Sequence, residues 1–194
     1  MPSPITSALD ALATKLDGLG LRWYVFGAQA VLVHGRPRLT EDIDITVDLG
    51  TLSIQELLVS LGEVGFALTV APDEEFLAVA RVAPLIHQPS GIGVDLIIAG
   101  PGLEQRFLEG SERCDLGGTE VPVIRAEHLL VTKILAGRPK DLLDVEGFLR
   151  RSGATLELDV TRAILAELEQ ALGQSDLMPL LDEQLERARR AAGA

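Results

Sequence analysis

The sequence predicts an α+β fold, in which a mixed sheet flanked by helices is followed by a C-terminal helical bundle. In residues 1–125, apolar stretches with the two-residue period of strands alternate with stretches of helical period. From residue 126 to residue 194, the apolar residues follow the helical period alone. No flexible linker separates the two parts. We therefore expect a sheet-containing core over 1–125, with the helical region 126–194 packed on it.

Capping residues and glycines mark the first elements. Ser3 followed by Pro4 is typical of a helix N-terminus, and leucines at helical spacing lead from there to Gly18, where the helix is expected to end. Residues 21–26 (LRWYVF) form an apolar run of strand length. Gly27 then opens a short helix, because glycine at the end of a strand favours a change of direction.

The later elements are predicted from the same signals. A second strand covers 42–47 (DIDITV), and Ser53 caps a following helix. Further strands, the last of them a hairpin, are expected at 66–71, 76–82, 94–100 and 114–124. Gly137 ends one helix and Pro139 starts the next. The helices of the C-terminal part are expected at 126–136, 139–151, 160–172 and 175–192.

Composition excludes several classes of protein. The 194 residues, 47% hydrophobic and 24% charged, are typical of a globular chain that buries a sizeable core. A net charge of −12 argues against a protein that coats DNA or RNA, so no DNA partner is expected. No stretch approaches the roughly 18 apolar residues of a membrane span. The N-terminus lacks a secretory signal and Cys114 is the single cysteine, which together favour a cytoplasmic location.

Two aspartates two residues apart stand out in the second strand. Asp42 and Asp44 point to the same side of that strand and lie about 6.5–7 Å apart along it. Carboxylates held in this way would repel each other unless a cation lay between them. Oxygen ligands of this kind, together with substrate phosphates, are those that Mg²⁺ prefers. The pattern therefore predicts a magnesium site for phosphoryl displacement.

Three neighbouring features support this prediction. Gly27 lets backbone approach a phosphate at a helix N-terminus, although a plain tight turn also explains it. Asp95 is the single charge in an apolar strand and would be a third carboxylate that takes a proton from an acceptor hydroxyl. The alternative for Asp95 is an edge-strand acid that faces water. Arg36, Arg38 and Thr40 would pair with a triphosphate, or else form an ordinary exposed loop.

A second set of charged residues lies in the helical part. Asp141 and Asp144 share one helix face with Val145 and Phe148. We therefore expect these acids to have partners such as Lys133 or Arg138. Direct contact with a ligand and a structural ion-pair network between two packed helices are both consistent with this pattern.

Two segments of the chain resemble a known superfamily. The segment FGAQAVLVHGRPRLTEDIDITVD is similar to the signature of DNA polymerase β-like nucleotidyltransferases, in which a Gly-Gly or Gly-Ser pair opens a helix before an Asp-x-Asp strand. VPVIRAEHLLVTKILAGRPKDLLDVEGFL resembles the helical motif of one branch, a lysine followed by Arg-x-x-Asp-x-x-Asp. That branch contains the abortive-infection nucleotidyltransferase toxins of type IV toxin–antitoxin systems.

The resemblance implies a role for each matching residue. Gly27 and Ala28 take the place of the glycine pair, and Asp42, Asp44 and Asp95 take the place of the metal-binding, catalytic acids. The implied nucleotide-binding residues are Gly27, Ala28, Gln29, Arg36, Arg38, Thr40, Lys133, Asp141 and Asp144. Two departures concern phosphate binding: Ala28 lacks the serine hydroxyl, and Gln29 stands where many members have serine.

The sequence therefore predicts a Mg²⁺-dependent nucleotidyltransferase that moves an NMP from an NTP to a hydroxyl acceptor. The acceptor is a tRNA end, a protein or a small molecule, and the resemblance implies a toxin with an antitoxin partner. A catalytically weakened nucleotide- or partner-binding module of the same fold is the alternative, because Ala28 and Gln29 depart from the pattern. A third hypothesis is purely structural, with the acids paired only to Arg36 and Arg38.

Overall fold

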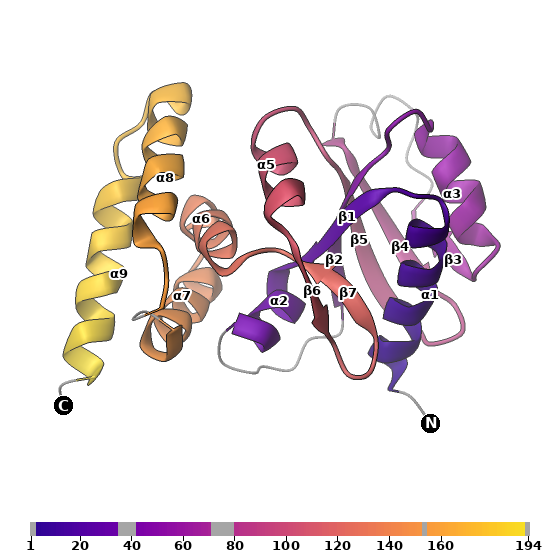
Figure 1. Ribbon diagram of the computed structural model, residues 1–194, viewed down its shortest axis with the longest axis horizontal. Helices are drawn as coiled ribbons and strands as arrows, with labels where there is room; N and C mark the ends of the chain where they lie inside the picture. The colour runs from indigo at the N-terminus through magenta and orange to yellow at the C-terminus, as the bar shows by residue number, and fades with distance from the viewer. Residues whose placement is uncertain (1–2, 35–41, 71–79, 153–154, 193–194) are drawn as a thin grey trace. The chain divides into compact units, whose positions relative to one another are not determined.

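The computed structural model describes residues 3–34, 42–70, 80–152 and 155–192 (Figure 1). Its helices in these ranges are α1 (Pro4–Gly18), α2 (Gly27–His34), α3 (Ile54–Gly62), α5 (Leu103–Gly110), α6 (Ala126–Ala136), α7 (Pro139–Ser152), α8 (Leu158–Leu172) and α9 (Leu177–Ala192). Its strands are β1 (Arg22–Phe26), β2 (Asp42–Asp48), β3 (Phe66–Leu68), β4 (Val82–His87), β5 (Ile92–Ile98), β6 (Glu112–Asp115) and β7 (Glu120–Val123).

The predicted α+β class is confirmed by a seven-stranded mixed sheet in the order β3-β4-β5-β2-β1-β7-β6. The pairs β2–β5 and β1–β7 are parallel. All other neighbours in the sheet are antiparallel. The acid-bearing strand β2 therefore lies inside the sheet, between β1 and β5.

Several predicted helix ends have the expected caps. The Ser3 side chain accepts a hydrogen bond from the backbone N–H of Thr6 at 3.1 Å, with Pro4 in the first turn of α1. Ser53 and Glu56 form a reciprocal capping box at the start of α3. Gly137 ends α6 in the left-handed conformation, with a φ of 59°. These signals explain why the helices begin and end close to the predicted residues.

One face of the sheet is sealed. The alternate residues Ile43, Ile45 and Val47 of β2 are fully buried, and so is Leu96 of β5. Helix α1 covers this face, since the indole N–H of Trp23 donates to the Asp17 carboxylate at 2.8 Å (Figure 1). The sealed face supplies much of the hydrophobic core, which leaves the opposite face of the sheet available for other residues.

Two elements differ from the prediction. Strand β4 covers Val82–His87, whereas the predicted strand covered 76–82, of which 76–79 lie outside the described residues. Pro84 argued against a strand at this position in the sequence, because proline cannot donate a hydrogen bond within a sheet. The structure accommodates it where the β3 ladder ends: the Pro84 carbonyl accepts a hydrogen bond from Thr69 N–H at 3.0 Å. Helix α5 was not predicted, and its N-cap, Gly102, offers no side-chain cap.

The chain divides into two compact units. One contains Met1–Gln29 and Leu39–Ile124, with the whole sheet and the helices α1, α3 and α5. The other contains Ala30–Arg38 and Arg125–Ala194, and therefore the helices α6 to α9. Buried Leu130, Ile134 and Leu165 contribute to the core of this helical unit.

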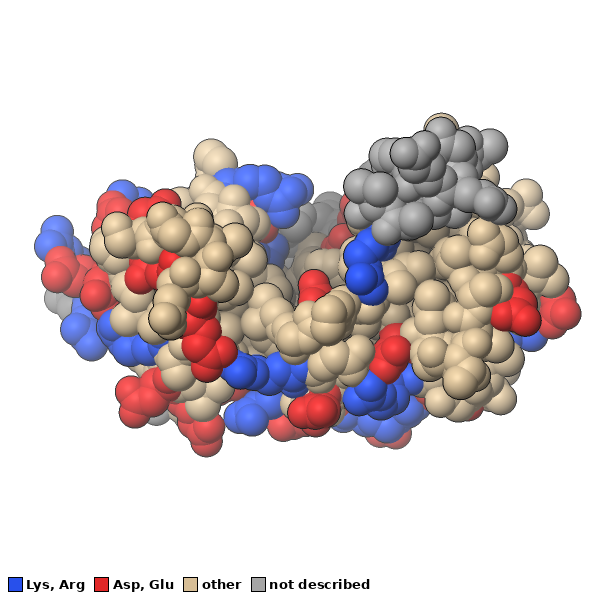
Figure 2. Space-filling model, turned by 90° about the horizontal axis from the view of Figure 1, so that it is seen from above, with Lys and Arg blue, Asp and Glu red and all other residues tan. Residues whose placement is uncertain are grey.

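One face of the described chain has mixed charge (Figure 2). In the face drawn in Figure 2, lysine and arginine side chains are interspersed with aspartates and glutamates on the coloured part of both units. Such a surface does not resemble the continuous basic stripe of proteins that coat nucleic acids. Every helix within the described ranges is too short or too polar to span a lipid bilayer.

Candidate active site

The sheet register places the three predicted acids on one face. Asp44 of β2 is the register partner of Asp95 on β5, and Asp42 is the partner of Gly93. Register partners on neighbouring strands point to the same side, and so do residues two apart on one strand. Asp42, Asp44 and Asp95 therefore share the face opposite to the sealed one. Their role as metal ligands stays a prediction.

The burial of Asp95 differs from the expectation. The apolar neighbours of Asp95 predicted a buried acid, or alternatively an acid on an edge strand. The structure shows an exposed carboxylate on a strand that lies between β2 and β4. The reason is that the two faces of β5 differ: Val94 and Leu96 fill the sealed face, whereas Asp95 points to the open one. Asp42 is likewise exposed, and Asp44 is half-buried.

Gly27 touches the central acid. It follows β1 directly, has a φ of +60°, and starts helix α2. A Cβ added to Gly27 would lie 1.8 Å from Oδ2 of Asp44, which no real pair of atoms tolerates. Glycine is required here for two reasons, the left-handed backbone and the close approach of the carboxylate. A plain tight turn therefore explains Gly27 only in part, because the Asp44 carboxylate also lies directly against this residue.

The other predicted residues of this turn are partly described. Ala28 and Gln29 are buried, with 3% and 2% of their surface exposed. The Nε2 of Gln29 has no hydrogen-bond partner among the described residues. An unsatisfied buried amide costs about 1–3 kcal/mol, which makes Gln29 a candidate for contact with a ligand. Arg36, Arg38 and Thr40 lie outside the described residues.

Next to Asp44, the open face of the sheet is covered at Thr46. Thr46 is 2% exposed and lies beside Tyr24, its register partner on β1. The Tyr24 ring packs edge-on against Phe107 of α5, with ring centroids 6.4 Å apart. Burial raises the pKa of Tyr24 to about 12, against the opposing effect of the hydrogen bond with Thr46. Helix α5 thus covers one end of this face.

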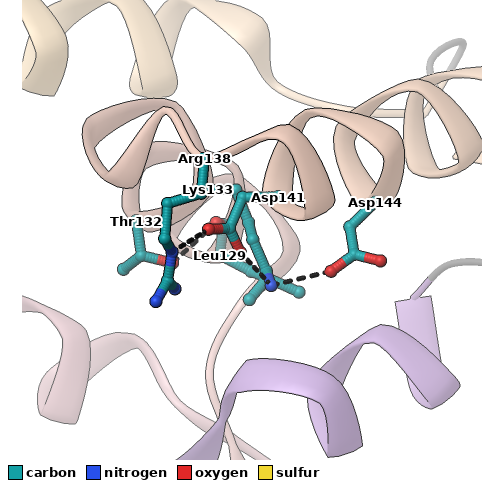
Figure 3. Close-up of polar contacts among 6 residues, drawn as sticks. All are labelled: Leu129, Thr132, Lys133, Arg138, Asp141 and Asp144. Carbon is teal, nitrogen blue, oxygen red and sulfur yellow. Dashed lines mark hydrogen bonds and ion pairs between the residues drawn. The ribbon is translucent and has the colours of Figure 1, made fainter. Parts of the chain in front are cut away.

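The second predicted cluster lies within the helical unit (Figure 3). The Lys133 ammonium on α6 donates to Oδ1 of Asp141 and to Oδ2 of Asp144 on α7, both at 2.8 Å. Nε of Arg138 donates to the other oxygen of Asp141. Lys133 is 8% exposed and Asp141 1% exposed, so both charges are buried. The predicted ion-pair network between two helices is present.

The charges in this cluster balance. Burial raises the pKa of Asp141, but hydrogen bonds and positive charges from Lys133 and Arg138 outweigh it, so the pKa lies below its ordinary value. Two cations and two carboxylates, including that of Asp144, leave no net charge. The network therefore joins α6 to α7 through buried ion pairs. Contact of Lys133, Asp141 and Asp144 with a nucleotide stays a prediction.

The acids of the sheet suit magnesium only with help from a substrate. Among the described residues, no group of three or more histidine, cysteine, aspartate or glutamate side chains is placed so that it could hold a metal ion. Mg²⁺ usually takes one or two protein carboxylates and completes its shell with water and phosphate oxygens. Asp44 and Asp95, in register on adjacent strands, have the chemistry for that arrangement. The residues thus fit a metal that binds together with a nucleotide.

Solved structures share the fold of this chain. An antigenic nucleotidyltransferase-like protein from Paracoccidioides brasiliensis is 21% identical, with 94% of this chain and 95% of that chain covered and a TM-score of 0.57. The antibiotic-resistance factor ANT(2'')-Ia is 15% identical over 87% and 94% of the two chains, with a TM-score of 0.58. The lincosamide antibiotic adenylyltransferase LnuA, with lincomycin bound, is 16% identical over 76% and 98%, with a TM-score of 0.52. The fold is therefore that of the polymerase β-like nucleotidyltransferases.

Comparison at the level of sequence families identifies the chain. No curated protein sequence matches it. The family model described as nucleotidyl transferase AbiEii toxin, type IV TA system, matches residues 10–192, which is nearly the whole chain. The chain belongs to the AbiEii family of type IV toxin–antitoxin systems, and it is a nucleotidyltransferase.

Proposed function

We propose that the protein transfers an NMP from an NTP to an acceptor hydroxyl in a Mg²⁺-dependent reaction, as the cytoplasmic toxin of a toxin–antitoxin pair. The observation that carries this proposal is the register that aligns Asp44 with Asp95 and leaves Asp42 on the same open face. Gly27, in contact with Asp44, supports the proposal because it places a helix N-terminus next to the acids.

Each of the three acids has a role in the proposed reaction. Asp42, Asp44 and Asp95 would hold Mg²⁺, which supplies positive charge for the triphosphate and for the entering and leaving oxygens when it is bound. Asp95 takes the proton of the acceptor hydroxyl. The acceptor oxygen forms a bond to the α-phosphorus, and the bond from the α-phosphorus to the bridging oxygen breaks. Pyrophosphate leaves with the electron pair of that bond.

The nucleotide would be bound by the turn around Gly27. Backbone N–H groups at the start of α2 suit a phosphate, and the amide of Gln29 takes over the contact that a serine makes in many members of the superfamily. Arg36, Arg38, Thr40, Lys133, Asp141 and Asp144 complete the proposed nucleotide-binding residues on the strength of the resemblance.

The experiment is transfer of label from each α-labelled NTP in the presence of Mg²⁺ and total cell extract. Asp44→Ala is expected to abolish incorporation. Asp48→Asn is the matched control, because Asp48 lies on the same strand and face but pairs with Arg22 at the far end. Label incorporated by Asp44→Ala would overturn the proposed site. NTP binding without any pyrophosphate release by the wild type would instead favour a binding module that has lost catalysis.

The toxin role has a separate test. Expression of the wild type is expected to arrest growth, and expression of Asp44→Ala is not. Co-expression of the product of the adjacent gene, if that product is the antitoxin, is expected to restore growth. Equal growth arrest by the wild type and by Asp44→Ala would separate toxicity from nucleotidyl transfer.

A further inference from the structure

The open face of the sheet continues beyond Asp95 onto β4. Asp95 is the register partner of Pro84, and Gly93 is the partner of Ile86. Two rows therefore cross the strands β2, β5 and β4 on this face. One row is Asp44–Asp95–Pro84 and the other is Asp42–Gly93–Ile86. Both rows begin with an acid and end with a half-buried apolar side chain.

Gly93 leaves an open gap in the second row. A Cβ added to Gly93 would meet no described atom within 4 Å, and its φ lies outside the left-handed range. Neither backbone conformation nor crowding requires glycine at this position. A glycine inside a strand lacks a side chain that would pack and weakens the strand, so this residue needs another explanation. The gap lies between Asp42 and Ile86, two residues before Asp95.

The direction of the proposed reaction assigns this gap to the acceptor. Gly27, where the nucleotide would bind, touches Asp44 from the β1 side, because Phe26 is the register partner of Asp44. In an in-line displacement the entering and leaving oxygens lie on opposite sides of the phosphorus. With the nucleotide on the β1 side of Asp44, the acceptor approaches from the β5 and β4 side. This step rests on the proposed function.

The side chains around the gap suit a molecule without negative charge. Pro84 and Ile86 form an apolar wall, and Asp42 and Asp95 are acids. Binding a nucleic acid backbone requires lysine or arginine at the phosphates. The described strands β4 and β5 contain no lysine or arginine. The guanidinium of Arg81, directly before β4, already donates to the carbonyls of Ile98, at 3.1 Å, and Ala99.

We infer that Gly93 is a specificity-determining residue, which keeps open a subsite for a small-molecule acceptor without negative charge. The acceptor hydroxyl lies at Asp95, and the apolar or planar group that carries it lies over Gly93 against Pro84 and Ile86. A side chain at position 93 fills this subsite without disturbing the fold. The nucleotide side of the site is unaffected by such a change.

The test combines fractionated acceptors with Gly93→Val. Wild type, Mg²⁺ and each α-labelled NTP are incubated with the small-molecule fraction, the protein fraction or the total RNA of a cell extract. Label is expected in the small-molecule fraction. For the labelled acceptor, Gly93→Val is expected to lower kcat/KM at least tenfold, with the calorimetric Kd for the NTP unchanged. Gly62→Ala, at another position with open space around the Cβ, is the control.

The outcomes separate this inference from the function on which it rests. Asp44-dependent labelling of RNA or of a protein, or labelling of a small molecule with equal efficiency by Gly93→Val, overturns the acceptor subsite and leaves the nucleotidyltransferase site intact. A parallel loss of NTP affinity and folding stability in Gly93→Val also overturns it, because the effect would then be structural. Labelling that does not depend on Asp44, or no labelling of any fraction, contradicts the proposed function itself.

Discussion

Replacement of Gly27 by alanine tests the contact between the helix turn and the central acid. At a φ of +60°, a residue with a Cβ pays about 1–2 kcal/mol. The new Cβ would lie 1.8 Å from Asp44 Oδ2, whereas ordinary contact begins at 3.4 Å, so the oxygen must move by 3.4 − 1.8 = 1.6 Å. Rotation of the Asp44 side chain out of its rotamer costs about 0.5–1.5 kcal/mol more.

A second glycine separates the two costs. Gly50 has a φ of +56°, but a Cβ added there meets no described atom within 4 Å. Gly50→Ala should therefore lose only the backbone cost, about 1–2 kcal/mol. Gly27→Ala should lose about 1.5–3.5 kcal/mol in the free energy of unfolding. Because it displaces a proposed metal ligand by more than 1 Å, Gly27→Ala should also lower transfer activity about 100-fold.

Urea denaturation measures the stability of both variants, and transfer from an α-labelled NTP measures their activity. A further readout is the rise in the denaturation midpoint on addition of Mg²⁺ and NTP, which should be smaller for Gly27→Ala than for Gly50→Ala. Equal loss of stability in the two variants, with full activity in Gly27→Ala, would refute the reasoning. It would mean that Asp44 moves aside freely and that its observed position is irrelevant to function.

Two further predictions concern buried charges outside the sheet site. Lys133→Ala leaves Asp141 and Asp144 without their shared cation, so the free energy of unfolding should fall by about 3–5 kcal/mol in urea titration. Lys15→Ala, which breaks an exposed ion pair, should cost less than about 1 kcal/mol, and similar losses would contradict a stabilising network. Burial lowers the pKa of His87, against the opposing effect of a hydrogen bond with the Val64 backbone, so the fold favours the neutral imidazole. Below about pH 6.5, His87 binds a proton more readily in the unfolded chain than in the fold, so the free energy of unfolding should fall as the pH drops. The wild type should show this pH dependence, and His87→Gln should not.

The sequence predicted those parts of the fold that depend on local signals. Alternation in DIDITV assigned Asp42 and Asp44 to one face, and the structure buries Ile43 and Ile45 on the other. Ser3, Ser53 and Gly137 predicted helix ends because each satisfies backbone groups within its own turn. Such signals need no knowledge of distant residues, which is why they are readable in the chain.

The remaining parts depend on which strands become neighbours. Apolar residues around Asp95 indicated burial, but the exposure of a strand residue depends on the element that covers its face. The alignment of Asp95 with Asp44 is a property of the β2–β5 register, which brings together residues about fifty positions apart. Strand β4 was obscured by Pro84, whose position at the end of the β3 ladder is also a tertiary property.

The same division between two faces explains how the chain tolerates three acids on one sheet. The sealed face, with Ile43, Ile45 and Leu96 fully buried, provides the core whether or not the open face contributes to stability. Asp44 and Asp95 lie on strands about 4.8 Å apart, where two negative charges in contact with water repel by up to about 1 kcal/mol. A cation bound between the two carboxylates would remove this repulsion.

Asp95→Asn is therefore expected to lose transfer activity and to gain stability. The variant keeps the shape of the side chain and removes one charge. The free energy of unfolding without Mg²⁺, measured by urea titration, should therefore rise by up to about 1 kcal/mol. Mg²⁺ with NTP should stabilise the wild type more than Asp95→Asn, because the variant has lost a ligand. Asp10→Asn, at an exposed position of α1, controls for the change in net charge. If Asp95→Asn is clearly less stable than Asp10→Asn, Asp95 has a structural partner, because only such a partner makes its charge favourable in the ligand-free fold. If Asp95→Asn responds to Mg²⁺ with NTP as the wild type does, Asp95 binds no metal.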